Sequence, residues 1–166
     1  CIDAHGAMER WDGHRGFGPL NAKRAMDRAC ELAKEYGIGC VALGNNNHWM
    51  RGGTYGWLAA DNGCIGICWS NTMPNMPAWG GLNRKIGNNP LIMAVPRSNG
   101  EHAMIDCAVS QFSYGKIEDC RLNGRQLPVP GGYDTKDNLT TDPAESEKTW
   151  RVLPTGYWIG SGPAIV

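Results

Sequence analysis

The chain has 166 residues, 42% of them hydrophobic, which is enough for one globular domain with its own core. Lysine plus arginine and aspartate plus glutamate number 16 each, so no basic excess favours nucleic acid or an anionic membrane surface. No apolar run approaches the roughly 20 residues that a membrane-spanning helix needs, and no signal peptide is visible. We therefore expect a cytoplasmic protein with neither nucleic acid nor membrane as a partner.

The chain begins at Cys1 without a methionine and ends on the apolar residues Ala164, Ile165 and Val166. Both ends look cut. We interpret residues 1–166 as the central domain of a longer protein, truncated at both ends.

Helix and strand patterns alternate along the first 70 residues. Apolar side chains recur every three or four residues from Pro19 to Tyr36, with proline in the first turn and Gly37 after the last, which predicts an amphipathic helix. The other expected elements are a short strand within 7–13, a strand at 39–43, a helix near 55–62 and a strand at 64–69. The last strand is continuously apolar and is expected to be buried on both faces. This order is typical of an α/β layer.

The second half of the sequence is richer in turn residues. Residues 73–90 carry many Pro, Asn and Gly and are predicted to be a loop, and 126–143 a long connection. Expected between and after them are a strand at 91–95, its partner at 102–109, a helix at 111–121 and a glycine-rich turn at 153–162.

The seven cysteines form an odd set without any CxxC pair. Most of them lie in or beside apolar runs, so buried free thiols are favoured over disulfides. The ligand spacing of a zinc site is missing, and no metal is expected.

A loop rich in amide and glycine residues follows the strand at 39–43 and contains His48. A strand that ends in such a loop is a common place for catalytic residues, and histidine exchanges a proton near neutral pH. Small side chains around His48 would let a ligand approach closely. The alternative is that His48 only caps a turn or fills a polar pocket.

Two further polar features stand at strand ends or within strands. Ser70, Asn71 and Thr72 follow the strand at 64–69, where ligands of open sheets are usually bound. Asp106 lies among apolar residues and needs a partner if it is buried. A nearby arginine or a ligand hydroxyl would serve, and a structural role is favoured over a functional one.

Common catalytic and nucleotide-binding motifs are missing. No GxGxxG follows a strand with an acidic residue about 20 positions on, and neither GxxxxGK[ST], GxSxG nor HExxH occurs. The residues alone therefore predict an α/β domain with a polar, aromatic-lined cleft near His48 and Thr72.

Several stretches spread over nearly the whole chain together resemble one family. They include NAKRAMDRA at 21–29, NHWMRGG at 47–53, IGICWSN at 65–71, IGNNPLI at 86–92, FSYG at 112–115, GRQLPV at 124–129 and LPTGYW at 153–158. On these motifs the chain is identified as a member of the malate/L-lactate dehydrogenase family, whose members lack a Rossmann fold.

The resemblance implies a dimeric NAD(P)-dependent oxidoreductase of small 2-oxo or 2-hydroxy acids, with the cofactor on a family-specific mixed β-sheet flanked by helices. NADH is favoured over NADPH. His48 matches the family's catalytic histidine, and an imidazole near neutral pKa can protonate the oxyanion that hydride transfer leaves. Asn71 and Arg51 are predicted to bind substrate. The predicted cofactor contacts are Thr72, His102, Ala103, Met104, Ile105, Asp106, Cys107, Ala108, Trp158 and Ile159.

The chain differs from the family pattern in three respects. A second family histidine, in a Ser-His-Gly segment, lies upstream of Cys1, Ile159 occupies a position that is often lysine, and the family's C-terminal part is missing. The alternative function is a non-catalytic fragment or paralogue that at most binds nucleotide. Within the family, malate, ureidoglycolate and sulfolactate are alternative substrates.

Overall fold

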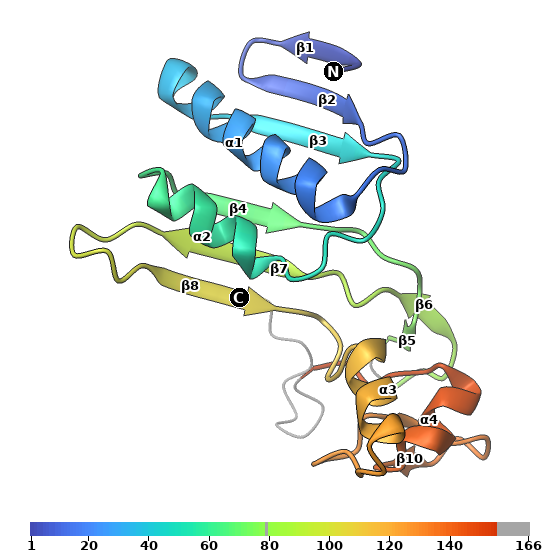
Figure 1. Ribbon diagram of the computed structural model, residues 1–166. Coiled ribbons are helices and arrows are strands. Elements are labelled where there is room, and N and C mark those ends of the chain that lie inside the picture. Colours follow the sequence, from blue (N-terminus) through green and yellow to red (C-terminus); the bar gives the residue numbers. More distant parts are fainter. Residues whose placement is uncertain (79, 156–166) are drawn as a thin grey trace. The chain divides into compact units, whose positions relative to one another are not determined.

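A computed structural model describes residues 1–78 and 80–155 and divides the chain into two compact units (Figure 1). The first unit contains Cys1–Trp69 and Leu91–Cys107. The second contains Ser70–Pro90 and the part of the chain from Ala108 onward. Each unit is described separately below.

The first unit begins with a three-stranded sheet of strand order β1-β2-β3. Strands β1 (Asp3–His5) and β2 (Met8–Asp12) are antiparallel, whereas β2 and β3 (Cys40–Gly44) are parallel and joined through helix α1 (Gly18–Tyr36). The strands predicted at 7–13 and 39–43 are confirmed. This β2–α1–β3 crossover is the parallel part of a mixed α/β architecture.

Helix α1 confirms the prediction from periodicity almost residue for residue. Pro19 lies in its first turn, and Gly37 ends it in the left-handed conformation, with φ of 83°, donating its backbone N–H to the carbonyl of Ala33. The helix buries a stripe of small and aliphatic side chains against β3 and α2. Its buried members are Gly18, Ala22, Ala25, Cys30 and Leu32.

A second, antiparallel sheet of order β4-β7-β8 completes the first unit. It consists of β4 (Gly66–Trp69), β7 (Leu91–Val95) and β8 (Ala103–Cys107), and helix α2 (Gly53–Asp61) packs against all three strands (Figure 1). Helix α2 lies close to β7 because Gly56 has no side chain. A Cβ at this position would lie 2.7 Å from Cγ2 of the buried Ile92.

One expectation about β4 is wrong. Its residues alternate between buried and exposed, and Trp69 is 67% exposed, so within the described residues only the face toward α2 is covered. The sequence could not show this because side chains on both faces of the strand are apolar. Ile67 lies on the uncovered face and Cys68 on the face that α2 covers.

The second unit is built from short elements. They are β5 (Met76–Pro77), β6 (Arg84–Ile86), α3 (Tyr114–Leu122), β9 (Gly132–Tyr133), β10 (Leu139–Thr140) and α4 (Pro143–Thr149). Strands β5 and β6 pair antiparallel, and so do β9 and β10. The core consists of Met76, Ile117, Cys120, Leu127 and Val152.

Here the structure corrects three predictions. The segments predicted as loop or connection, 73–90 and 126–143, each contain a two-stranded ladder, although the strands have only two or three residues. Helix α4 was not expected because its polar sequence shows no apolar stripe. Asp142 caps it, accepting a hydrogen bond from the backbone N–H of Ala144 at 2.8 Å. The helix expected at 111–121 is α3, shifted to begin at Tyr114.

All seven cysteines are free, as predicted. Cys30, Cys68 and Cys120 are buried, but Cys1 and Cys107 are exposed, so burial of the thiols is only partly confirmed. Among the described residues no helix has the length and apolar character needed to cross a membrane.

Candidate functional site

The candidate site of the first unit is the loop between β3 and α2, which carries His48. The His48 side chain is exposed, and its Nδ1 accepts a hydrogen bond of 2.8 Å from the backbone N–H of Met50. In a neutral imidazole the proton is then on Nε2, which leaves that nitrogen as a donor. The imidazole is thus held in the tautomer whose Nε2–H can donate a hydrogen bond to a ligand.

The small and amide residues around His48 make contacts within the chain. The Nδ2 group of Asn47 donates to the carbonyl of Arg15 at 2.6 Å, and that of Asn21 donates to Oδ1 of Asn46 at 2.9 Å. A Cβ on Gly18 would lie 2.1 Å from the carbonyl oxygen of His48. These residues therefore fix the loop against the beginning of α1.

Trp49 and Tyr55, which are not among the predicted site residues, also hold the loop. The rings of Trp49 and Tyr55 are stacked, with centroids 5.5 Å apart, and the Tyr55 hydroxyl donates to the carbonyl of Trp49 at 2.6 Å. The NHWMRGG stretch contains Trp49 but does not indicate this stacking, because stacking depends on how the loop turns into α2.

Arg51 and Asp106 lie beside one another in the structure. Asp106 Oδ2 accepts from the backbone N–H of Gly53 at 3.1 Å and lies 3.5 Å from Nε of Arg51. The expected partner of this carboxylate is therefore an arginine together with the N-terminus of a helix. The Arg51 side chain is 71% exposed and that of Asp106 28%, so the guanidinium remains accessible to a carboxylate ligand.

The predicted cofactor strand 102–108 presents its residues to two different faces. Met104 and Asp106 face α2, since Met104 packs with the cluster of Tyr55 and Ile92. Strand alternation puts Ala103, Ile105 and Cys107 on the opposite face, where all three are exposed. Ala108 belongs to the second unit.

His102 is occupied by protein contacts. Its Nδ1 accepts from the backbone N–H of Arg97 at 3.1 Å, and its Nε2 lies 3.1 Å from Oδ1 of Asp61. Its side chain is 9% exposed and the ring lies beside that of Trp57. Both ring nitrogens therefore have protein partners, so a cofactor contact of His102 would use the edge or face of the ring.

Asn71 and Thr72 lie in the second unit. The Thr72 hydroxyl lies 2.9 Å from Oδ1 of Asn88 and accepts from the backbone N–H of Asn89 at 3.2 Å. A Cβ on Gly87 would lie 2.3 Å from the same hydroxyl. Thr72 is thus tightly held, whereas Asn71 is exposed.

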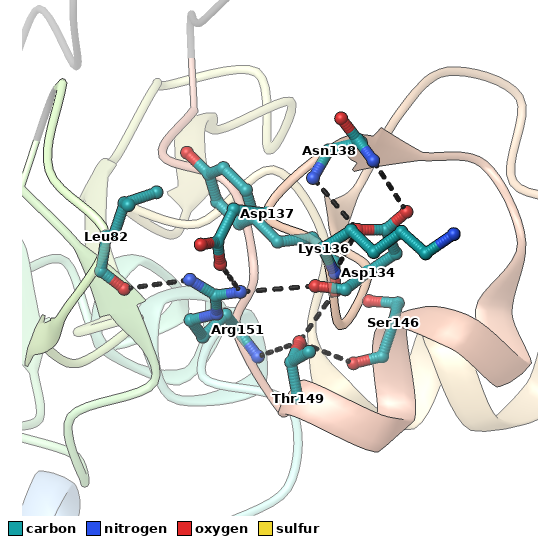
Figure 2. A network of polar contacts seen from close by, with 9 residues as sticks. Leu82, Asp134, Lys136, Asp137, Asn138, Ser146, Thr149 and Arg151 are labelled. Carbon is teal, nitrogen blue, oxygen red and sulfur yellow. Dashed lines mark hydrogen bonds and ion pairs between the residues drawn. The ribbon is translucent and has the colours of Figure 1, made fainter.

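Figure 2 shows a polar network around Arg151, which follows helix α4 in the second unit. The guanidinium donates to the carbonyls of Leu82 and Asp134, each at 3.2 Å, and to Oδ1 of Asp137 at 2.5 Å. It also lies over the ring of Tyr133. Arg151 therefore joins the segments around Leu82 and Asp134. The predicted cofactor contacts Trp158 and Ile159 lie outside the described residues, as does most of the turn predicted at 153–162.

The predicted residues thus fall into separate groups. His48, Arg51 and residues 102–107 belong to the first unit, and Asn71, Thr72 and Ala108 to the second. Across residues 1–78 and 80–155, no group of three His, Cys, Asp or Glu side chains is arranged to hold a metal ion.

A family model described as malate/L-lactate dehydrogenase matches residues 1–166. Among curated proteins, 2,3-diketo-L-gulonate reductase from Citrobacter koseri is 56% identical over 165 residues, which is 99% of this chain and 49% of the relative. The chain therefore spans about half the length of the curated relatives it matches.

Solved structures of dehydrogenases are also similar to this chain, at lower sequence identity. Malate dehydrogenase from Entamoeba histolytica is 30% identical with a TM-score of 0.86, over 93% of this chain and 44% of that protein. Sulfolactate dehydrogenase from Methanocaldococcus jannaschii is 33% identical with a TM-score of 0.77, again over 93% and 44%.

Proposed function

The chain belongs to the malate/L-lactate dehydrogenase family, and from that premise we propose that it is the central, cofactor-binding part of an NAD(P)-dependent oxidoreductase that reduces a small 2-oxo acid. The observation that carries the proposal is the exposed His48, whose Nδ1 accepts from the Met50 amide and whose Nε2 is left as a donor.

The proposed substrate is 2,3-diketo-L-gulonate or a closely similar acid. Its support is the 56% identity to a reductase of that name, against 33% and 30% to the sulfolactate and malate dehydrogenases. Sulfolactate, malate and ureidoglycolate are the alternative substrates. We propose NADH as the cofactor in preference to NADPH.

The residues of the first unit fit such a cofactor in part. In the described sheet β8 is an edge strand, so backbone N–H and C=O groups on its outer side are open to a ligand. On its uncovered face, Ala103 and Ile105 offer small and apolar surface for a flat ring. The ring nitrogens of His102 are bonded to Arg97 and Asp61, so His102 contributes by anchoring the beginning of β8.

A bound nicotinamide supplies the hydride that the carbonyl carbon of the substrate receives. His48 donates its Nε2–H to the carbonyl oxygen as negative charge develops there, and solvent returns a proton to the ring, so that carbon and oxygen together gain the two hydrogens of the alcohol and the neutral imidazole is regenerated. Arg51 binds the substrate carboxylate through its exposed guanidinium. Asn71 remains a proposed substrate contact. Thr72, Trp158 and Ile159 remain proposed cofactor contacts.

We further propose that the full-length protein is a cytoplasmic homodimer, as the family resemblance implies. One face of the β4-β7-β8 sheet is apolar and is not covered by any residue in the described ranges 1–78 and 80–155, which supports a packing partner, either from elsewhere in the full-length chain or from a second copy.

The test is the loss of NADH absorbance when the full-length gene product is mixed with 2,3-diketo-L-gulonate, with malate, sulfolactate and NADPH measured in parallel. Turnover that is fastest with the diketo acid and NADH supports the proposal. Calorimetry with NADH separates the alternatives: binding without turnover of any 2-oxo acid would mean a non-catalytic nucleotide-binding paralogue.

A further inference from the structure

The loop of His48 is held on its far side by a buried tyrosine. Tyr55, on the first turn of α2, is 4% exposed, and its hydroxyl donates to the carbonyl of Trp49 at 2.6 Å. The stacked rings of Trp49 and Tyr55 reinforce this contact. The hydroxyl keeps its proton at neutral pH and remains a donor, and burial raises the pKa of Tyr55 still further above its ordinary value of 10.0. The residue that follows His48 is therefore fixed at its carbonyl group.

The same loop is held at its end by a carboxylate from β8. Helix α2 has Gly52 at its N-cap, no side-chain cap and no acidic residue in its first turn. Asp106 supplies the missing negative charge and hydrogen-bond acceptor at the helix N-terminus, since its Oδ2 accepts from the N–H of Gly53 at 3.1 Å. The fit is close, because a Cβ on Gly53 would lie 2.4 Å from that oxygen.

Between these two points the backbone adopts an unfavourable conformation. Met50 has φ of 65°, in the left-handed region that residues with a Cβ rarely occupy. This is the residue whose N–H donates to Nδ1 of His48. The hydrogen bond that selects the imidazole tautomer therefore depends on a strained residue, and strain of this kind persists only where its surroundings enforce it.

We infer that Tyr55 and Asp106 are positioning residues, which hold the loop so that the Met50 amide keeps the proton of His48 on Nε2. Neither residue needs to touch the substrate for this. The inference rests on the proposed function, because it assigns these residues to the proton transfer by His48.

The experiment compares Tyr55→Phe with Tyr114→Phe in the full-length enzyme. Tyr55→Phe keeps the stacked ring and removes only the hydroxyl. Tyr114 is a matched control, since its hydroxyl also donates to the carbonyl of a tryptophan, Trp150, at 2.7 Å, but in the second unit. We expect Tyr55→Phe to lower kcat roughly 3- to 10-fold, the effect of one hydrogen bond, with KM for NADH within about twofold. Tyr114→Phe should leave both constants unchanged.

A second measurement needs no turnover. Nitrogen NMR of the His48 ring reports which nitrogen carries the proton, and hydrogen exchange reports the protection of the Met50 and Gly53 amides. Tyr55→Phe and Asp106→Asn should both increase the Nδ1-protonated tautomer and speed exchange of these amides, and Tyr114→Phe should do neither.

The outcomes separate this inference from the proposed function. If Tyr55→Phe and Asp106→Asn leave the His48 tautomer and the exchange rates unchanged, the inference is wrong even in an active enzyme. If the tautomer shifts as expected but neither the wild-type enzyme nor any variant reduces a 2-oxo acid, the positioning is right and the proposed reaction is wrong.

Discussion

Glu9 on β2 and Arg28 on α1 form an ion pair in which Nε and Nη2 of the guanidinium both lie 2.8 Å from one carboxylate oxygen. The other oxygen accepts from the indole N–H of Trp11 at 2.8 Å. Glu9 is 8% exposed, and these bonds, first that from Arg28 and then that from Trp11, lower the pKa of the Glu9 carboxyl below its ordinary value of 4.5. The pair joins the helix of the crossover to its sheet.

A pH dependence of stability follows from this pair. Because the pKa is lower in the folded state, the stabilisation is fully present above pH 4.5 and is lost as the pH falls through the folded-state pKa. We expect Glu9→Gln to lower the free energy of unfolding at neutral pH and to flatten its decline in acid. Denaturant titrations at several pH values would measure this. Glu101→Gln, at an exposed position of the same unit, is the control; an equal change in both variants would contradict the prediction.

His48→Ala should lower kcat of the full-length enzyme by roughly 10²- to 10⁴-fold, because it removes the Nε2–H that the proposed reaction donates to the substrate oxygen. Steady-state kinetics with NADH and the 2-oxo acid would measure the effect. His5→Ala removes a histidine of the same unit that is 82% exposed and should be silent. A change confined to KM would instead make His48 a substrate-positioning residue.

Two glycines in helices should respond to alanine in opposite directions. Gly56→Ala places a methyl group 2.7 Å from Cγ2 of the fully buried Ile92, so we expect α2 to be pushed from its sheet at a cost of about 1–3 kcal/mol. At Gly115 in α3 the nearest atom is 4.0 Å away, and alanine should stabilise by up to about 1 kcal/mol through its higher helix propensity. Thermal unfolding of both variants gives the comparison, and a stabilising Gly56→Ala would refute the packing argument.

The thiols should differ strongly in reactivity. Burial raises the pKa of Cys30 to about 11, with a further contribution from the neighbouring Cys64, and burial raises that of Cys68 to about 11. Relative to an ordinary value of 9.0, the thiolate fraction near neutral pH falls about 100-fold. Alkylation followed by peptide mass spectrometry should therefore modify the exposed Cys1 and Cys107 first. Rapid labelling of Cys30 in the native protein would contradict this order.

The elements that the sequence predicted correctly are those with a local signal. Helix α1 has its apolar stripe, its Pro19 and its Gly37 within one continuous segment, and β3 and β7 are short apolar runs between turn residues. Helix α4 lacked such a signal, since its residues are polar and only Asp142 and Pro143 mark its beginning. The short ladders β5–β6 and β9–β10 are too brief for any periodicity.

The sequence by itself determined the alternation of helices and strands, the free thiols and the loop that presents His48, because each depends on neighbouring residues or on composition. Only the tertiary structure decided which face of β4 is covered, that His102 is saturated by Arg97 and Asp61, and that Tyr55 and Asp106 hold the His48 loop. The physical reason is that these contacts join side chains far apart in the sequence. Their partners are set by how the strands pair and how α2 packs on the sheet, which local propensity does not encode.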